Sequence, residues 1–520
     1  MTPRMLAPMM ALALAGCRAD GGSDTDFGTD LASDTYFADG DADTEPPDLG
    51  EPEQEDDFLA LTPAQTSQYV FIASPTRDTL TRVDVTSNDV RTVTVGRGPA
   101  AVLAPNDDVI VVFNKIDDTV SFVDAHTLAQ TTIPVRDNMN RMILSPDAAW
   151  VALFHDEDVD EFEPSSGLQS FNEVSFVDVA GQLHHPMAVG FHPKNIAFSA
   201  DGLTAAVVSD DTLAMVDLTA GTLIPNVVRL SDDLVSPPPA EEVILSPNGQ
   251  WAFVRQFGSG EIVVIELSTE TRHRIPIGSN PTDMDLSPDG TTVAVVARIS
   301  EELVLLDADD PLTGVVESIP LPTAQQLGSL AFTPDGTKAI VYTTAARVDR
   351  YALFDMSTRQ MSLRGLVKPV KQVAITPTGE TMLVFHTKED VPDPDLSSPF
   401  TGRWALTMVD LTDERTNPLL LPEEPIGYAN AASGDLGYFI MEGQPLLEVL
   451  HYDSLLHEEV PLKSAPVYVG VMSDDSLLDG DEPSAWASQI HTLGRISFFE
   501  PDATTLETIT GFELNAAIED

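Results

Sequence analysis

The residues best suited to chemistry in this sequence form one acidic segment. Six of the eight residues 156–163 are carboxylates, and a histidine precedes them. Calcium prefers about six to eight oxygen ligands, many of them from carboxylates, so the segment contains the groups that a calcium site needs. The alternative is a solvated acidic surface with only an electrostatic role. The candidate calcium ligands are His155, Asp156, Glu157, Asp158 and Asp160.

Three long insertions interrupt the pattern of strands, at 155–172, 387–403 and 477–489. Each is predicted between the second and third strands of a four-stranded repeat unit, so the three insertions share one face. Loops held by a rigid scaffold are common binding sites. We therefore predict an acidic binding face that includes Glu161, Glu163, Asp390, Asp393, Asp479, Asp481 and Trp486.

Histidines offer a second kind of metal ligand. His184 and His185 are adjacent, so in a strand their side chains point to opposite faces and cannot both bind one metal. His155, His386 and His491 each fall beside an insertion, and a three-histidine site on the binding face is the alternative to purely structural roles. The sequence has no nucleophile elbow, phosphate-binding glycine loop or zinc-protease motif.

Residues 1–17 resemble a bacterial lipoprotein signal peptide. One positive charge precedes an apolar run at 5–15, which is too short to span a bilayer. Leu14-Ala15-Gly16-Cys17 is similar to a lipobox, and this resemblance implies that Cys17 is lipidated and begins the mature chain. Arg18 follows instead of Asp, which by the same resemblance implies the outer membrane. An ordinary signal peptide that contains a cysteine is the alternative.

Residues 18–68 are predicted to form a disordered acidic tether. Residues 19–57 contain 15 acidic and no basic residues. They also contain too few apolar groups to offset the entropy that would be lost if the segment became ordered. The whole chain has 83 acidic and 27 basic residues, a formal net charge of −56. That charge repels phosphate backbones and argues against nucleic-acid binding. Since Cys17 is the only cysteine, the chain cannot form an internal disulfide.

Residues 69–520 repeat a unit of about 40 to 55 residues. Each unit contains four short β-branched runs separated by turn signals, as in "PTDMDLSPDG", "TTVAVVAR", "EELVLLDADD" and "VVESIPLP". Such a unit must stack on neighbours to cover its faces, so we predict an all-β propeller of four-stranded antiparallel blades. We count ten blades in a single ring, or seven to eight if some repeats are miscounted.

Two markers recur in the repeat. Turns such as Pro288-Asp289-Gly290 stand between the first and second strands, where proline fixes φ, the acid caps the turn and glycine adopts a left-handed conformation. An acid also ends each third strand. We predict that it caps the next turn, because a catalytic role would need several converging groups. The ten acids are Asp84, Asp124, Asp178, Asp217, Glu266, Asp307, Asp355, Asp410, Asp453 and Glu500.

The two ends of the repeat region are predicted to complete one blade together. The N-terminal part offers three strands, at 68–74, 80–87 and 89–96, while 511–520 has the pattern of an unpaired first strand. Closing a ring in this way removes exposed sheet edges.

The segment "NDVRTVTVGRGPAAVLAPNDDVIVVFNKIDDTVSFVDAHT", residues 88–127, resembles the YVTN-type β-propeller repeat, and 277–298 repeats the pattern. The tetrapeptide Tyr-Val-Thr-Asn itself does not occur. The resemblance spans about residues 69–518 and implies a propeller. Some propellers that resemble this one are lactone hydrolases or related sugar-acid enzymes, but no catalytic residue can be carried over.

These features favour a binding scaffold over an enzyme. We expect an exported, monomeric propeller that is anchored by lipid at the outer membrane, on its periplasmic or cell-surface side. It would touch the membrane only through that anchor and would bind an envelope protein or polysaccharide. The alternative function is a metal-assisted hydrolase of lactone or sugar-acid type.

Overall fold

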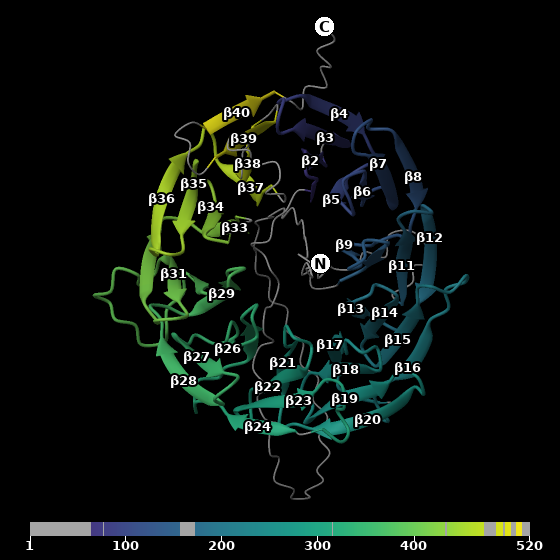
Figure 1. Cartoon of the computed structure of the whole chain (residues 1–520), viewed down its shortest axis with the longest axis vertical. Coiled ribbons are helices and arrows are strands. Elements are labelled where there is room, and N and C mark those ends of the chain that lie inside the picture. Colours follow the sequence, from purple (N-terminus) through teal and green to yellow (C-terminus); the bar gives the residue numbers. More distant parts are fainter. Residues whose placement is uncertain are drawn as a thin grey trace, which may run out of the picture.

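The computed structural model describes residues 64–75, 77–156, 172–233, 235–314, 316–431, 434–472, 485–491, 494–500 and 506–511. They form ten four-stranded antiparallel sheets around one central axis (Figure 1). All regular elements in this part of the chain are strands. The predicted all-β propeller with ten blades is therefore confirmed.

In each blade the first strand lies nearest the axis and the fourth lies at the rim (Figure 1). Blade 1 contains β1 (Ala64–Gln65), β2 (Tyr69–Ser74), β3 (Thr79–Asp84) and β4 (Val90–Thr94). Blade 2 contains β5 (Pro99–Leu103), β6 (Val109–Asn114), β7 (Thr119–Asp124) and β8 (Gln130–Pro134). Blade 3 contains β9 (Arg141–Leu144), β10 (Trp150–Phe154), β11 (Glu173–Asp178) and β12 (Leu183–Ala188). Blade 4 contains β13 (Pro193–Phe198), β14 (Thr204–Ser209), β15 (Thr212–Asp217) and β16 (Asn226–Arg229). Blade 5 contains β17 (Ala240–Leu245), β18 (Trp251–Gln256), β19 (Glu261–Glu266) and β20 (Thr271–Pro276).

The second half of the ring repeats this order. Blade 6 contains β21 (Pro281–Leu286), β22 (Thr292–Ala297), β23 (Glu302–Asp307) and β24 (Glu317–Pro320). Blade 7 contains β25 (Ser329–Phe332), β26 (Lys338–Tyr342), β27 (Arg350–Asp355) and β28 (Gln360–Gly365). Blade 8 contains β29 (Val370–Ile375), β30 (Thr381–His386), β31 (Trp404–Asp410) and β32 (Thr416–Leu421). Blade 9 contains β33 (Pro425–Asn430), β34 (Leu436–Met441), β35 (Leu446–His451) and β36 (Leu456–Pro461). Blade 10 contains β37 (Pro466–Val471), β38 (Ala485–Gln489), β39 (Arg495–Phe499) and β40 (Leu506–Thr510).

The second and third strands are buried on both faces because each blade packs between two others. In blade 6, β22 and β23 carry unbroken apolar runs, and Leu303 of β23 shares a buried cluster with Ala339 and Phe354 of blade 7. Burying one such side chain contributes about 1.5–3 kcal/mol, so the stacking of blades supplies much of the stability. The fourth strands face solvent, as the exposed β36 shows.

The Ser-Pro-Asp-Gly turns close themselves with their own side chains. Ser287 Oγ donates to Asp289 Oδ1 (2.6 Å) and accepts from the Thr292 N–H (3.0 Å). Asp289 also accepts from the Thr291 N–H (3.1 Å), and Gly290 has a φ of 73°, which glycine adopts without strain. The Ser or Thr bond across the turn recurs at Ser145, Ser199, Ser246, Thr333 and Thr376.

Most of the acids predicted to end the third strands cap turns. Asp355 Oδ1 accepts from the N–H groups of Ser357 (2.9 Å) and Thr358 (2.8 Å). The Thr358 N–H and the Ser357 hydroxyl are the main causes that lower the pKa of Asp355 to about 2. The same capping occurs at Asp84, Asp124, Asp217, Asp307 and Asp410.

Blade 10 packs against blade 1 and closes a single ring. Apolar side chains of β2 and β3 share one buried cluster with those of β38 and β39. Trp486 Nε1 donates to Gln65 Oε1 (3.1 Å), and Asn88 Nδ2 donates to Glu507 Oε1 (2.8 Å). Two polar contacts and an apolar cluster therefore join the ends of the repeat.

The first strand of blade 1 is β1, so the prediction that 511–520 supplies it is wrong. β1 pairs with β2 through Ala64↔Phe71 and Gln65↔Val70. Residues 512–520 lie outside the described part of the chain. The propeller thus includes Ala64, inside the segment predicted as tether.

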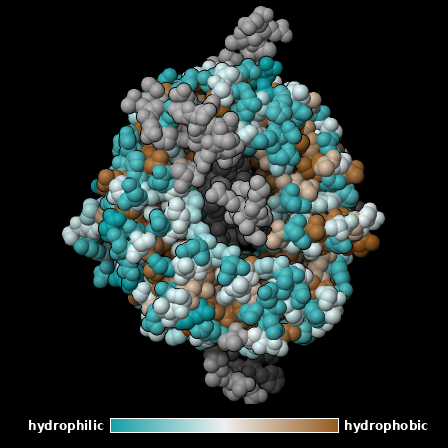
Figure 2. Space-filling model, in the orientation of Figure 1, coloured by the Kyte–Doolittle hydropathy of each residue, from teal (hydrophilic) through white to brown (hydrophobic). Residues whose placement is uncertain are grey.

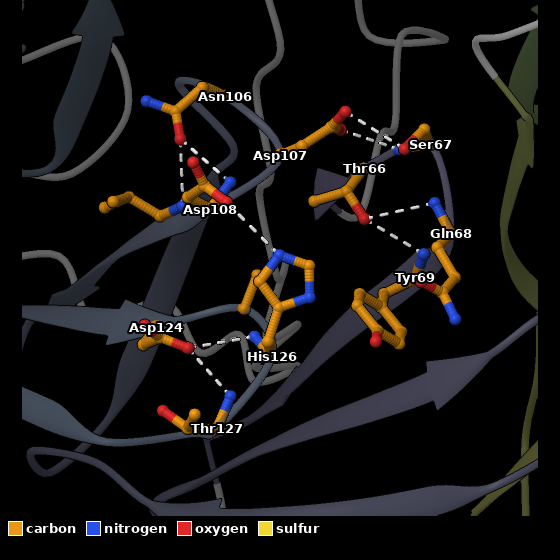
Figure 3. A network of polar contacts seen from close by, with 12 residues as sticks. Thr66, Ser67, Gln68, Tyr69, Asn106, Asp107, Asp108, Asp124, His126 and Thr127 are labelled. Atoms are coloured by element: carbon orange, nitrogen blue, oxygen red, sulfur yellow. Dashed lines mark hydrogen bonds and ion pairs between the residues drawn. The ribbon is translucent and has the colours of Figure 1, made fainter.

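Contacts with blade 2 hold this short strand in place (Figure 3). Thr66 Oγ1 accepts from the Tyr69 N–H (2.9 Å), as the turn Ser does in other blades. The N–H and Oγ of Ser67 donate to the carboxylate of Asp107 (2.8 and 3.0 Å), which belongs to the first turn of blade 2.

The ring has two unlike faces. We call the side with the connections between strands one and two and between strands three and four the turn face, and the opposite side the loop face. Antiparallel neighbours place these connections at opposite ends. Each blade adds the acid of its third strand to the turn face, whereas Arg359 and Arg415 are the only lysine or arginine residues in the described part of its connections.

Hydrophilic residues cover most of the face seen in Figure 2, with hydrophobic ones interspersed. Across the described ranges, we find no helix long and apolar enough to cross a membrane.

Candidate functional site

Two of the three insertions begin and end at the loop face, as predicted. Residues 155–172 connect β10 to β11, and 387–403 connect β30 to β31, which are second and third strands. The prediction for 477–489 is wrong, because the long connection of blade 10 joins β37 to β38, its first and second strands. That connection belongs to the turn face, so the three insertions do not share one rim.

Trp486 is not a residue of a binding loop. It lies within β38 and is fully buried, in the cluster that joins blades 10 and 1. Its indole N–H bonds to Gln65, so its role is to close the ring. Asp479 and Asp481 lie outside the described residues.

His155 and Asp156 are the described members of the candidate calcium site. Asp156 Oδ2 accepts a hydrogen bond from Arg141 Nε (2.7 Å), and His155 Nδ1 lies 2.7 Å from the carbonyl oxygen of Asn138. No group of three or more His, Cys, Asp or Glu side chains among the described residues is arranged to hold a metal. Calcium stays a prediction that depends on Glu157, Asp158 and Asp160, which lie outside those residues, as do Glu161 and Glu163.

The insertion at 387–403, which we call the finger, is built around a buried lysine. Lys368, in the connection before β29, has a side chain only 2% exposed. Its Nζ donates to Asp390 Oδ1 (2.5 Å) and to the carbonyl oxygens of Lys388 (3.0 Å) and Phe400 (3.2 Å). Asp390 Oδ2 also accepts from the Gly402 N–H (2.8 Å). The lysine and its carboxylate thus tie the two ends of the finger together.

The middle of the finger is exposed. It projects outward from the ring beside β31 (Figure 1). Of the two acids predicted here for the binding face, Asp393 is exposed, while Asp390 is partly buried in the ion pair with Lys368. The finger presents Asp393 to solvent and uses Asp390 for its own structure.

The histidines have structural surroundings. His386 is fully buried, with Nε2 2.7 Å from Thr407 Oγ1, and burial lowers its pKa to about 4. Burial also lowers the pKa of His184 to about 4, and its Nε2 lies 2.9 Å from Ser175 Oγ. The predicted group of His155, His386 and His491 is not arranged to hold a metal.

Charged residues on the inner strands of blades 4 to 6 were not predicted. Lys194 of β13 and Glu241 of β17 form an ion pair (3.1 Å) between blades, and Arg255 of β18 pairs with Glu242 (2.9 Å). Lys194 and Glu241 are the extra residues of β-bulges at the start of their strands, a feature that redirects a side chain. Charges from consecutive blades therefore meet near the axis.

Asp283 bonds to the free edge of the next blade. Its Oδ2 accepts the Leu330 N–H of blade 7, and its Oδ1 accepts the Met284 N–H of its own strand (2.6 Å). Burial raises the pKa of Glu242 on the preceding blade. An inner strand has an unpaired edge toward the axis, and Asp283 satisfies part of it.

Asp285 is the unusual member of the group. It lies on β21, two residues before the turn, at a position where seven other blades have apolar residues, namely Val102, Ile143, Ala197, Ile244, Ala331, Ala374 and Ala429. Burial, with the nearby charge of Glu242, raises the pKa of Asp285 to about 7. The strand sequence "PTDMDL" holds the signal, which is an acid at position 285 where other blades are apolar.

The sequence matches no protein-family model, and a search of curated proteins gives no match. Among solved structures, a eukaryotic initiation factor is 12% identical, with 76% of this chain and 97% of that chain covered and a TM-score of 0.52.

Two other structures are similar at lower TM-scores. Dihydro-heme d1 dehydrogenase NirN in complex with DHE is 17% identical over 69% of this chain and 74% of its own, with a TM-score of 0.46. The β-propeller domain of Cps50 (Swd1) from Myceliophteria thermophila is 13% identical over 57% and 93%, with a TM-score of 0.33. At these identities the similarity concerns the fold alone.

Proposed function

We propose that this protein is an exported, lipid-anchored β-propeller of YVTN type that binds an envelope protein through its loop face. The observation that carries the proposal is the unlike construction of the two faces. Apart from the long connection of blade 10, most turns on the turn face are short, and many are capped by their own Ser, Thr and Asp residues. The loop face carries a long connection that a buried lysine holds in shape.

Site-directed photocross-linking tests which face binds. A benzophenone amino acid replaces Ile116, Ile299 or Ile490 on the loop face, and Leu203, Ile224 or Leu312 on the turn face; all six are exposed. In cells that produce the full chain, we expect protein adducts from the first set and none from the second. Adducts mainly from the turn face, or from neither face, would refute the proposal, and adducts only with glycans would assign a polysaccharide partner instead.

Lipid anchoring is tested separately at Cys17, the only cysteine of the chain. Cys17→Ser should abolish incorporation of a palmitate analogue and release the protein from the membrane fraction. Arg18→Asp is the control for sorting, because it keeps the lipidated cysteine and alters only the residue after it. A variant without Cys17 that stays in the membrane fraction contradicts the anchor.

The metal-assisted hydrolase has less support. Asp283 bonds to a backbone N–H group of the next blade, Glu242 pairs with Arg255, and Asp156 pairs with Arg141. These carboxylates stabilise the ring or its loops, whereas catalysis needs carboxylates directed at a substrate.

A further inference from the structure

The finger has a fixed shape before any partner binds. All three N–H donors of Lys368 Nζ bond to the finger. Two of them bond to backbone carbonyl oxygens at opposite ends of the finger, those of Lys388 and Phe400. A buried lysine is costly unless its charge is paired, and Asp390 supplies that pair. Ordering a loop costs conformational entropy, and the bonds of the buried cation offset part of that loss.

The tip is stiffened as well. Pro392, Pro394 and Pro399 restrict the backbone on both sides of it. Asp395 Oδ1 accepts from the N–H (2.9 Å) and Oγ (2.6 Å) of Ser397, and its carbonyl oxygen accepts from Thr401 Oγ1 (2.7 Å). A loop that is ordered before binding loses less entropy when it binds.

The ordered tip presents a leucine to solvent. Leu396 is 84% exposed, and the exposed Asp393 and Asp395 precede it in the chain. An aliphatic side chain next to acids suits an apolar pocket with a basic rim, which proteins have. Sugars are instead bound by stacking on aromatic rings, and the one aromatic residue of the finger, Phe400, is half-buried at its base.

We propose that the finger is a preformed protein-docking element whose Leu396 inserts into an apolar pocket rimmed by lysine or arginine on the partner. This inference rests on the proposed function and adds to it a specific anchor residue and the chemistry of the partner. Charge complementarity supports it, because Asp393 and Asp395 lie beside the anchor on a chain with a net charge of −56.

The anchor is tested by placing the benzophenone amino acid at position 396 in the full-length chain. Leu420 is the matched control, since it is an exposed leucine on the outer strand of the same blade. We expect one protein adduct from position 396 and none from 420. Equal yields at the two positions, or adducts with lipid or glycan at 396, overturn the inference. Adducts from Ile116 or Ile490 but not from 396 would leave the scaffold function intact and remove only the finger.

The adduct identifies the partner, whose affinity is then measured with purified proteins. Leu396→Ala should weaken binding about tenfold or more, as the loss of a central apolar anchor does, whereas Leu420→Ala should not change it. Asp393→Lys should weaken binding more at low salt than at high salt, because it reverses a charge beside the pocket. Unchanged affinity for Leu396→Ala overturns the anchor, and a salt-independent effect of Asp393→Lys overturns the basic rim.

A separate variant tests whether the finger is ordered before it binds. Lys368→Met with Asp390→Asn removes the buried pair together, so no unpaired charge is left in the protein. We expect weaker binding through slower association, with the thermal unfolding of the ring preserved. A double variant that folds and binds as fast as the parent contradicts a preformed finger.

Discussion

In most turns of the turn face, a hydroxyl and a carboxylate two or three residues apart hold the shape of the turn. The Ser287 hydroxyl spans its turn by bonding to Asp289 and to the Thr292 N–H. The polar groups of these turns find their hydrogen-bond partners within five residues. These residues therefore stabilise the fold, and their hydrogen-bonding groups are already used within the turn.

Ser287→Ala should lower the free energy of unfolding by about 1–2 kcal/mol, because two hydrogen bonds across the turn are lost. Urea titration followed by tryptophan fluorescence measures the change. Ser454→Ala is the control, since Ser454 is an exposed serine of another turn. Equal midpoints for the two variants would show that the hydroxyl does not hold the turn.

The raised pKa of Asp285 predicts that the free energy of unfolding falls as the pH rises. Its folded-state pKa, about 7, lies above the ordinary value of 3.8. The folded protein therefore binds the proton more tightly, and the stability that this contributes is complete below about pH 4 and lost as the pH rises through 7.

Asp285→Asn removes this dependence. We expect the melting temperature of the variant, relative to the parent, to be higher at pH 8 than at pH 5. Asp393→Asn, which alters an exposed acid, should give the same small difference at both pH values. A constant difference for Asp285→Asn would mean that the carboxyl is ionised throughout that range.

Residues that act within one turn could be predicted from the sequence, and residues that act between blades could not. The capping roles of Asp355 and Asp289 could be predicted from their spacing alone. Glu242, Asp285 and Lys368 meet their partners only after blades stack or an insertion folds back, so local pattern carries no sign of the contact.

At the scale of elements, regular blades were predicted well and the shortened ones were not. β1 has two residues, too few for the alternation that marks a strand. In blade 10 the second strand is β38, beyond the acidic insertion, whereas the insertion was expected to follow the second strand. An insertion inside a hairpin separates the two strands that would otherwise identify it.

The finger gives a prediction at this scale. Lys368→Met with Asp390→Asn should speed amide hydrogen exchange across 388–402 while β30 and β31 stay protected. Lys388→Met is the control, since the exposed Lys388 side chain lies on the finger but its carbonyl alone bonds to Lys368. Slow exchange of the finger in the double variant would contradict the ordering role of the lysine.

At the scale of the whole molecule, the count of ten blades in one ring followed from the repeat, but its method of closure did not. Closure depends on β2 and β3 meeting β38 and β39, which are far apart in sequence. The apolar residues of both strand pairs can be read from the sequence, but the sequence does not indicate that the two pairs pack against each other.

Trp486→Ala should destabilise the ring where it closes. The side chain is fully buried between blades 10 and 1, so we expect a loss of about 3–5 kcal/mol. Differential scanning calorimetry measures the change, and Asn88→Ala, which removes one exposed contact across the same junction, should cost much less. Similar melting temperatures for the two variants would mean that the tryptophan does not hold the junction.

The central claim is that the loop face binds the partner protein, whereas the turn face only stabilises the ring. Blocking one face at a time tests this claim most directly. Because Cys17 is the only cysteine, a cysteine placed at Ile116 or Ile299, or at Leu203 or Leu312, can be coupled to a polyethylene glycol maleimide in a chain whose own cysteine is lipidated or replaced by serine. We predict that the polymer on the loop face prevents formation of the partner complex and that the polymer on the turn face leaves it intact. A complex that survives blocking of the loop face, or is lost when only the turn face is blocked, would contradict the account.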